Sequence, residues 1–372
     1  MQVHDFRAGL QAWIDARGDD LVAPLEDDRV DAQLDHQRRV QQMLFDEDWM
    51  RWGWPKRLGG LGGSPILRAV LGEELTSRAL VHTTSWSMHE VLGPAVAEFG
   101  QPEMVHEIFP RLLRGDEFWC QGFSEPDAGS DLGSLRTTAR AVGDDWLING
   151  EKLWTSFAQH ATRCVVLART GEAGSRGVSA FLVDMNTPGV STSALRTMAD
   201  VDEFCSTALV DVKVPAHRLL GEVNGGWRVA QHILACERGP IFWQRGAWLN
   251  HHLGMLLGVA EDAASQTVLG EAYEMLWAFR ARSKATQDRI AVGDLPGPEA
   301  SVDKLLIAAA DQLLFDTAHE LLSGAIETDD TPRGRAWRRE WAYSRAATIY
   351  GGTSEIQKDI VATRILGLPR SA

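Results

Sequence analysis

The chain has 372 residues, of which 44% are hydrophobic and 24% charged, and its formal net charge at pH 7 is −14. This length exceeds one ordinary core and predicts two or three domains, while the composition is that of a soluble globular protein without an apolar run of the ~20 residues that a membrane helix needs. The acidic balance argues against a nucleic-acid partner and against binding to an anionic membrane surface.

The first 118 residues show the helical spacing of apolar side chains. One face of the first predicted helix carries Phe6, Leu10, Trp13 and Ile14. This segment lacks a basic region followed by an apolar core, so it is not a secretory signal, and we expect a cytoplasmic protein. HEVLGPAVAEFG and PEMVHEIFPRLLRG repeat the spacing, and each ends in glycine. These patterns predict an all-helical N-terminal domain over residues 1–118.

The pattern changes to strands near residue 119. CVVLART, VSAFLVDM and TALVDVKVP are rich in β-branched and apolar residues and are separated by turn residues. In WLINGEKLW, the pair Asn149 and Gly150 stands between two alternating apolar segments, which predicts a β-hairpin turn at these two residues. We therefore predict a middle β domain over residues 119–222.

From GGWRVAQHILACERG onward the helical period returns, interrupted by GDLPGPEAS at 293–301, and predicts a helical domain over residues 223–372. The order helical, β, helical does not fit a Rossmann alternation and indicates the α+β class. Four scattered cysteines without a CxxC pair predict buried reduced thiols, with neither a metal site nor a disulfide. These are Cys120, Cys164, Cys205 and Cys236.

Two segments of the middle block carry chemistry. In QGFSEPDAGSDLGSLRT, Gly129 and Ser130 could bring backbone N–H groups against a phosphate or a flavin edge, although an ordinary polar turn has the same composition. In EKLWTS, Trp154 could lie flat against a planar cofactor while Thr155 and Ser156 offer hydroxyls or N–H groups to ring heteroatoms. A core tryptophan is the alternative interpretation.

Together, FSEPDAGSD, NGEKLWTS about thirty residues later and the C-terminal IYGGTSEIQ resemble the acyl-CoA dehydrogenases. The resemblance extends over the whole chain, including the WP…GG…G loop at 54–63 and ILGLPR at 365–370. It implies an acyl-CoA dehydrogenase-like fold with an N-terminal helical domain, a middle β-barrel or sandwich domain and a C-terminal four-helix bundle. It also implies a noncovalently bound FAD.

The resemblance assigns a set of cofactor contacts from the middle block and from the C-terminal motif. Ser354 and Gln357 form an S-x-x-Q capping pattern, which predicts that Gly352 and Thr353 lie at a helix N-terminus with free N–H groups. An ordinary helix start is the alternative. The residues expected to bind FAD are Gln121, Phe123, Ser124, Gly129, Ser130, Trp154, Thr155, Ser156, Gly352, Thr353 and Glu355.

The reaction that the resemblance implies removes an α-proton from an acyl-CoA thioester while the β-hydride passes to the flavin, giving a 2-enoyl-CoA. It needs a carboxylate whose pKa is raised by desolvation, and donors for the developing enolate oxygen. Many relatives place this base in an IYEGT sequence, where this chain has Gly351, which has no side chain to take a proton.

A minority of the family, including the long-chain and isovaleryl types, carries the base on a helix at a glutamate immediately before an arginine. Glu237 and Arg238 match that arrangement here. We therefore predict Glu237 as the catalytic base and Gly351 as a backbone donor to the thioester carbonyl, with Ser130 and Arg238 contacting the substrate. The alternative for Glu237 is a structural ion pair with a neighbouring arginine.

The chain departs from the family pattern in the half of the FAD site that a second subunit supplies. Where relatives carry an arginine for the FAD pyrophosphate this chain has Gln266, and Arg280 and Arg282 a few turns later are possible substitutes. The run near the adenine is also degraded, to ELLSG at 320–324. We expect either a homotetramer or an α2β2 heterotetramer with a related subunit, as in bacterial steroid catabolism, and a bulky steroid-derived acyl-CoA as one conceivable substrate.

An electron-transferring flavoprotein is the expected electron acceptor. Two other functions remain open from the sequence alone. One keeps the fold and FAD but reacts with O2, as acyl-CoA oxidases and related flavin monooxygenases do. The other is a non-catalytic subunit that completes the FAD site of a partner and holds Glu237 in a structural ion pair.

Overall fold

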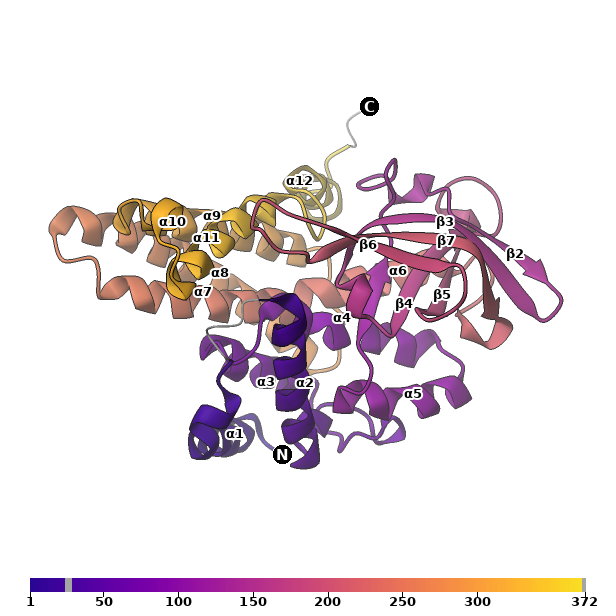
Figure 1. The fold of residues 1–372 in the computed structure, drawn as a ribbon, viewed down its shortest axis with the longest axis horizontal. Coiled ribbons are helices and arrows are strands. Elements are labelled where there is room, and N and C mark those ends of the chain that lie inside the picture. The colour runs from indigo at the N-terminus through magenta and orange to yellow at the C-terminus, as the bar shows by residue number, and fades with distance from the viewer. Residues whose placement is uncertain (24–28, 370–372) are drawn as a thin grey trace.

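The computed structural model describes residues 1–23 and 29–369, and its helices and strands follow the helical, β, helical order predicted from the sequence. In Figure 1 the N-terminal helices lie below, the strands lie to one side and the C-terminal helices extend to the other side. The N-terminal helices are α1 (Val3–Arg17), α2 (Val30–Asp46), α3 (Ile66–Ser77), α4 (Thr83–Phe99) and α5 (Pro102–Arg114). The predicted apolar face of α1 is buried, as expected from its spacing.

The middle of the chain forms one mixed eight-stranded sheet. Its strands are β1 (Trp119–Gly122), β2 (Thr138–Val142), β3 (Asp145–Ser156), β4 (Arg163–Arg169), β5 (Val178–Asp184), β6 (Val190–Leu195), β7 (Phe204–Pro215) and β8 (Leu219–Leu220). The order is β6-β7-β3-β2-β4-β5-β8, and β1 pairs in parallel with β4. Because β1 and β3 are the two strands that carry the sequence motifs, this topology brings those motifs to the same region of the sheet.

The hairpin turn predicted at Asn149 and Gly150 is wrong. Strand β3 runs straight through both residues, and the turn between β2 and β3 lies at Gly143 and Asp144 instead. A register shift between β3 and β7 falls at this point, so the two residues form part of a bulge and not of a turn.

Contacts distant in the sequence explain this bulge. The Asn149 side chain bridges to β7, with its Nδ2 3.0 Å from the Asp211 carboxylate and its Oδ1 2.8 Å from the Asp211 N–H. A Cβ on Gly150 would lie only 2.7 Å from the Cα of Thr137. Residue 150 must therefore be glycine because the backbone of Thr137 lies so close to it. The Asn-Gly pair, which often marks a hairpin turn, is explained here by this contact.

The C-terminal helices are α6 (Gly226–Cys236), α7 (Phe242–Leu257), α8 (Ala263–Ala291), α9 (Ala300–Leu321), α10 (Ala325–Thr328), α11 (Pro332–Ser344) and α12 (Ser354–Ile360). A π-helical turn over Glu237–Ile241 joins α6 to α7. One apolar core is shared by α7, α8, α9 and α11, including Leu249, Phe279, Phe315 and Trp337. The predicted fold class, helical domain, β domain and helical bundle, is confirmed.

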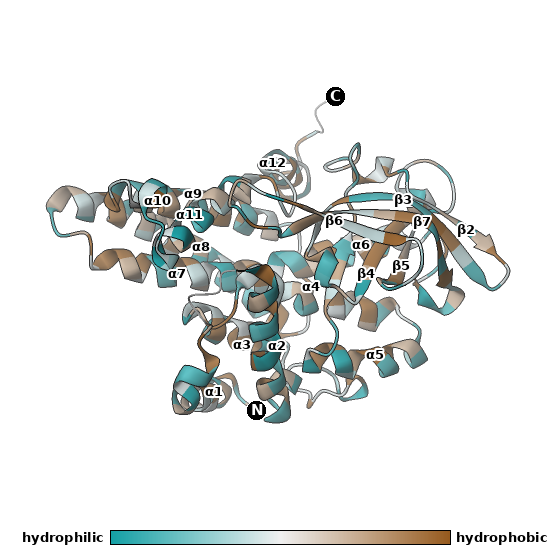
Figure 2. Ribbon diagram, in the orientation of Figure 1, coloured by the Kyte–Doolittle hydropathy of each residue, from teal (hydrophilic) through white to brown (hydrophobic). Residues whose placement is uncertain are grey.

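Helix α4 connects the parts of the molecule, because it packs against α5, α6, β1 and the π-helical turn. A second core joins α4, α5 and α6 to one face of the sheet, and includes Val91, Phe109, Trp119, Leu182 and Ile233. In Figure 2 the strands β4 and β5 at this junction are mostly hydrophobic. All four cysteines are buried and free, as predicted. Within residues 1–23 and 29–369, no helix is both long and apolar enough to cross a membrane.

Candidate active site

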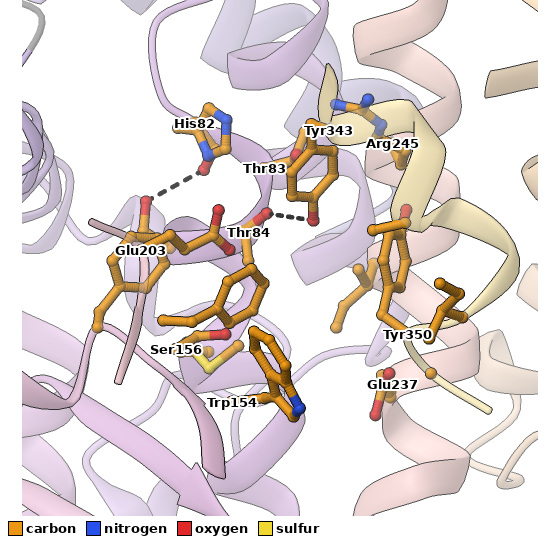
Figure 3. Close-up of a pocket in the computed structure, with 18 of the residues that line it drawn as sticks. His82, Thr83, Thr84, Trp154, Ser156, Glu203, Glu237, Arg245, Tyr343 and Tyr350 are labelled. Carbon is orange, nitrogen blue, oxygen red and sulfur yellow. Dashed lines mark hydrogen bonds between the residues drawn. The ribbon is translucent and has the colours of Figure 1, made fainter. Parts of the chain in front are cut away.

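A large cavity lies where α4, the strands β1 and β3, the π-helical turn and the residues before α12 meet (Figure 3). Its volume of about 2420 Å³ exceeds the ~300–1,000 Å³ of an ordinary ligand pocket. Most of its lining area is apolar, and its wall includes residues from the N-terminal helices, the sheet and the C-terminal helices. The cavity therefore has room for more than one ligand at once.

The sheet side of the cavity is formed around Trp154. A register shift between β3 and β7 lies between Lys152 and Thr155, and Trp154 at its centre has a left-handed backbone with φ +62°. The bulge turns the indole out of the sheet, where 57% of Trp154 is exposed. A planar aromatic surface that is exposed at the wall of a large cavity can stack against a planar ligand.

Strand alternation separates the two hydroxyl residues that follow Trp154. Ser156 lies on the cavity side and lines it, whereas Thr155 is fully buried on the other face of the sheet. Among the described residues, the Thr155 hydroxyl has no hydrogen-bond partner. The Thr155 hydroxyl therefore does not face the cavity, because residues one apart on a strand point to opposite faces.

A buried ion pair holds the first motif against β3. The Lys152 ammonium lies 2.7 Å from a Glu125 carboxylate oxygen and 3.3 Å from the Phe123 carbonyl oxygen. The same carboxylate accepts hydrogen bonds from the N–H groups of Arg136 and Thr137, at 2.6 and 2.9 Å. Burial and the carboxylate act on Lys152 in opposite directions, and burial dominates, so the pKa of Lys152 is lowered. Sequence reasoning missed this pair, although both residues stand inside the quoted motifs.

This pairing brings the first motif to the cavity. The Leu153 N–H donates to the Ser124 carbonyl oxygen at 2.9 Å, which keeps the two motifs in contact. The predicted residues of the first motif that line the cavity are Gln121, Phe123, Ser124, Gly129 and Ser130. The two sequence motifs thus form one continuous wall, as their proposed common role requires.

Glu237 projects from the opposite wall, on the π-helical turn. Pro240 lies within this turn, has no N–H to donate and would crowd the carbonyl one helical turn earlier, so the α-helical hydrogen-bond ladder is interrupted. The backbone widens locally to the π-helical form, an arrangement frequent at functional sites. Sequence reasoning predicted a continuous helix here, and the proline was the signal that it overlooked.

The Glu237 carboxylate makes no direct ion pair with the described residues, although two cations lie near it. Burial raises its pKa, and the nearby Arg238 and Lys304 oppose this shift only in part. Among the described residues, no hydrogen bond or ion pair to the Glu237 side chain exists, so the alternative of a structural ion pair with arginine lacks support. A half-buried carboxylate with a raised pKa in a cavity wall has the properties of a general base.

Gly351 lies directly against Glu237. Its φ is +64°, and a Cβ built on it would meet a Glu237 carboxylate oxygen at 2.7 Å and the Lys304 Cε at 3.5 Å. The Lys304 ammonium donates to the Ala347 carbonyl oxygen and lies 4.4 Å from the Tyr350 ring centre, and burial lowers the pKa of Lys304 to about 8. The glycine therefore leaves the space that the Glu237 carboxylate uses, and no described residue accepts a hydrogen bond from its N–H.

The start of α12 differs in detail from the prediction. The helix is capped by Thr353, whose hydroxyl accepts from the Ile356 N–H at 3.3 Å, and not by a capping box of Ser354 and Gln357. Gln357 instead donates from its amide to the carbonyl oxygens of Gly351 and Gly352, at 3.0 and 3.4 Å. This contact orients the glycine pair toward the cavity, which Gly351, Gly352 and Thr353 all line.

Glu355, the remaining cofactor-binding candidate of this motif, is exposed and lies outside the cavity lining. Its expected role therefore has no support from the geometry of a single chain. Arg238, next to the predicted base, does line the cavity, and burial lowers its pKa. Within the described residues its guanidinium makes no ion pair, so it is available to an anionic ligand.

Arg280 and Arg282 are engaged within their own chain. Arg280 pairs with Glu73 and stacks on the Trp243 ring at 3.5 Å. Arg282 donates to the Glu299 carbonyl oxygen at 2.9 Å and lies near a carboxylate of α9. Gln266 stands exposed in the first turns of α8. Neither arginine is free in this arrangement for the FAD contact that the sequence suggested as a possible role.

A cluster of polar residues lines the cavity away from Glu237, and no sequence motif predicted it. We call this cluster the polar end of the cavity, and it comprises His82, Thr84, Glu203, Arg245, Trp248 and Tyr343. In Figure 3, His82, Tyr343 and Arg245 lie at one side of the view, and Trp154 and Glu237 lie at the other. Its members come from α4 and the residue before it, from α7 and α11, and from the residue before β7, so only the tertiary fold brings them together.

Three family models match successive parts of this chain. The acyl-CoA dehydrogenase N-terminal domain matches residues 4–116, the middle domain matches residues 120–211 and the C-terminal domain matches residues 224–366. These ranges follow the order of helical, β and helical parts described above. The residues that line the cavity thus come from all three matched domains.

Individual proteins match over similar lengths. Acyl-CoA dehydrogenase IpdE1 of Mycolicibacterium smegmatis is 33% identical over 395 residues, which cover 100% of this chain and 99% of that protein. The short-chain specific acyl-CoA dehydrogenase of human mitochondria is 30% identical, and the match covers 85% of this chain and 80% of that protein.

Two solved structures resemble the whole fold. The Tcur3481-Tcur3483 steroid ACAD has a TM-score of 0.86 and 27% identity, with 99% of this chain and 98% of that chain covered. The ChsE4-ChsE5 complex from Mycobacterium tuberculosis has a TM-score of 0.85 and 26% identity, with 100% and 98% covered. Both descriptions name two different components.

Proposed function

The chain belongs to the acyl-CoA dehydrogenase family, and we propose that it dehydrogenates an acyl-CoA thioester between the α and β carbons with Glu237 as the base. The observation that carries this proposal is the isolated Glu237 carboxylate. Its pKa is raised by burial, it lines the cavity opposite Trp154, and it stands against Gly351, which cannot itself take a proton.

FAD is the cofactor that the family implies, and the residues present fit it. Trp154 offers an exposed aromatic face, and the cavity has the volume for a flavin beside a substrate. On the other side, the N–H groups of Gly352 and Thr353 have no acceptor among the described residues. Gln121, Phe123, Ser124 and Ser156 would hold the ring system, and Gly129 and Ser130 would lie near its phosphates. When bound, FAD supplies the acceptor for the β-hydride.

The chain's own groups then account for the proton and for the enolate charge. Glu237 removes the α-proton, because a carboxylate with a raised pKa is a stronger base than an exposed one. The Gly351 N–H, which has no acceptor among the residues described, is available to the thioester carbonyl oxygen, where negative charge develops. Ser130 and Arg238 are the proposed contacts to the substrate.

A screen of acyl-CoA thioesters tests the dehydrogenation. Short, long, branched and steroidal thioesters would be supplied with an artificial electron acceptor, to protein prepared with and without a related subunit. We expect at least one thioester to reduce the flavin, and Glu237→Gln to lower the rate constant of flavin reduction by ~10²–10⁴-fold. Glu107→Gln, an exposed glutamate on α5, is the matched control and should keep the rate.

The same experiment separates the other candidate functions. Near wild-type turnover by Glu237→Gln would contradict the assignment of the base, and if activity then followed only the partner's own glutamate, this chain would be a non-catalytic subunit. Release of hydrogen peroxide in step with turnover would identify an oxidase. With an electron-transferring flavoprotein as acceptor, we expect reduction of that protein and no peroxide.

We also propose that the chain works in a heterotetramer with a related subunit. Support comes from two structural relatives whose descriptions each name two components. It also comes from the intrachain contacts of Arg280 and Arg282, which leave the pyrophosphate contact unfilled by this chain. A purified single chain that forms an active homotetramer with one FAD per subunit would overturn this proposal.

A further inference from the structure

The polar end of the cavity is unsuited to a plain hydrocarbon chain. Glu203 is 6% exposed, and its carboxyl group makes no hydrogen bond or ion pair to any described residue. Burial raises the pKa of Glu203 to about 7, and Glu340 adds to this shift while His82 and Arg245 oppose it. Buried polar groups are rarely left without partners in folded proteins, so a ligand atom is a natural partner here.

Two further donors at the polar end lack acceptors. The Arg245 Nη1 and the Trp248 Nε1 are buried, and neither has a hydrogen-bond acceptor in the described part of the chain. A hydroxyl pair lies beside them, with the Thr84 Oγ1 3.1 Å from the Tyr343 Oη, and either oxygen can be the donor. The polar end thus offers both donors and acceptors to an incoming group.

The charges already present indicate what kind of group this is. The other nitrogens of Arg245 lie 2.8 and 2.9 Å from Asp311 and 2.9 Å from Glu340, so one guanidinium already faces two carboxylates. Burial lowers the pKa of His252 to about 4, which leaves that ring neutral near pH 7. The charge of Arg245 is therefore balanced by its two carboxylates, and a neutral oxygen fits beside this guanidinium better than a carboxylate.

We propose that the polar end binds a hydroxyl or carbonyl oxygen on the distal part of the acyl group, so that the enzyme selects oxygenated acyl-CoA thioesters over plain hydrocarbon ones. This inference rests on the proposed function, because the oxygen belongs to the substrate of that same site. Arg245 lies eight residues after Glu237, across the π-helical turn and the start of α7, which is at most roughly 12 Å at the rise of an α-helix. A short acyl chain that carries two fused rings has about this reach.

The test compares two thioesters that differ in one oxygen. The probes are 3-(decahydronaphthyl)propanoyl-CoA with and without a hydroxyl group on the distal ring. Equilibrium binding is measured by calorimetry on the flavin-loaded Glu237→Gln protein, in complex with its partner subunit if it has one. We expect the hydroxylated thioester to bind roughly tenfold more tightly or better, because a site built to hydrogen-bond a hydroxyl group rejects the analogue without it.

Variants then assign the preference to the polar end. Glu203→Leu and Thr84→Val, each in the Glu237→Gln background, should reduce the preference to less than about threefold. Thr317→Val removes another buried hydroxyl that has no partner among the described residues, on α9 outside the cavity, and should leave the preference unchanged. Circular dichroism checks that the variants fold. If a variant does not fold, the comparison of the two probes on the Glu237→Gln protein still tests the proposal.

The outcomes distinguish this inference from the proposed function. Equal affinity for the two probes would overturn the polar end as an oxygen site, while flavin reduction by either probe in the protein that keeps Glu237 would still support dehydrogenation. Tighter binding of the hydroxylated probe without any flavin reduction would uphold the polar end and contradict the proposed function. Binding of neither probe would overturn the inference.

Discussion

At the scale of single residues, Glu237 and Gly351 compete for one space in the cavity wall. A side chain at residue 351 and the carboxylate of Glu237 cannot both occupy it, because a Cβ there would lie 2.7 Å from a Glu237 oxygen. This contact gives a physical reason why a chain with its base at Glu237 carries glycine in the IYGG segment. A side chain at residue 351 and the Glu237 carboxylate are therefore mutually exclusive occupants of this part of the cavity.

The pH dependence of catalysis should reflect the raised pKa of Glu237. The base must be ionised, so kcat/KM should fall as the pH is lowered through this pKa, which lies above the ~4.3 of an exposed glutamate. Lys304 opposes the shift, so Lys304→Met should move the acidic limb to higher pH. The measurement is a pH profile of kcat/KM, with Lys284→Met on the exposed face of α8 as control. An acidic limb that does not move in Lys304→Met would contradict this electrostatic account.

A methyl group at residue 351 should harm catalysis more than stability. In Gly351→Ala the Cβ displaces the Glu237 carboxylate, and a misplacement of about 1 Å can cost ~10²-fold in rate. The left-handed backbone adds roughly 1–2 kcal/mol of destabilisation. Gly143→Ala is the matched control, since Gly143 also has a positive φ, at +59°, but no atoms near its Cβ. Stopped-flow flavin reduction and denaturant titration measure both effects, and equal rates in the two variants would refute the prediction.

At the residue scale, most of the residues that the sequence suggested for the site line the cavity, because short motifs with a recognisable spacing carry them. Thr155 is an exception, since its hydroxyl points to the opposite face of the strand from Ser156. The sequence also could not predict the polar end, since Thr84, Glu203 and Tyr343 are far apart in the chain. Contacts of this kind are decided by packing and leave no local pattern.

At the scale of elements, the changes from helix to strand and back were visible because the hydrophobic period changes there. In the sequence, the helical spacing of hydrophobic residues ends at Gly115, and in the structure α5 ends at Arg114. Two local irregularities were missed, the β-bulge at Gly150 and the π-helical turn around Glu237. The bulge depends on a contact distant in the sequence and the π-helical turn on a proline, and the periodicity of hydrophobic residues reveals neither. The π-helical turn carries the proposed base.

The two motifs should separate if their buried ion pair is broken. Lys152→Met leaves Glu125 with two backbone donors but without its counter-charge, and losing one partner of a buried pair costs about 3–5 kcal/mol. We expect a lower denaturation midpoint and weaker retention of flavin, with an unchanged rate per bound flavin. Lys213→Met breaks an exposed pair with Asp145 and should cost at most about 1 kcal/mol. If both variants retain flavin equally, the ion pair does not position the site.

At the scale of the whole molecule, one face of α8 has the character of a subunit interface. Tyr273 and Trp277 are 53% and 62% exposed and lie one helical turn apart, on the longest helix of the chain. Adjacent exposed aromatic residues are costly to leave in water and are enriched at protein interfaces. Gln266, where relatives carry a residue for the second half of the FAD site, precedes them on the same helix.

Replacing these two aromatic residues should therefore dissociate the assembly and empty the FAD site together. In the double variant Tyr273→Ser, Trp277→Ser we expect a smaller assembly by light scattering and fewer flavins per chain, since each buried aromatic side chain contributes ~1.5–3 kcal/mol to association. Val210→Ser, at an apolar residue of β7 that is 62% exposed, is the control and should change neither. Adding the related subunit in excess should not raise the flavin content of the double variant to the wild-type level. An assembly of unchanged mass in the double variant would place the interface elsewhere, and unchanged flavin content in a dissociated chain would mean that one subunit completes the site alone.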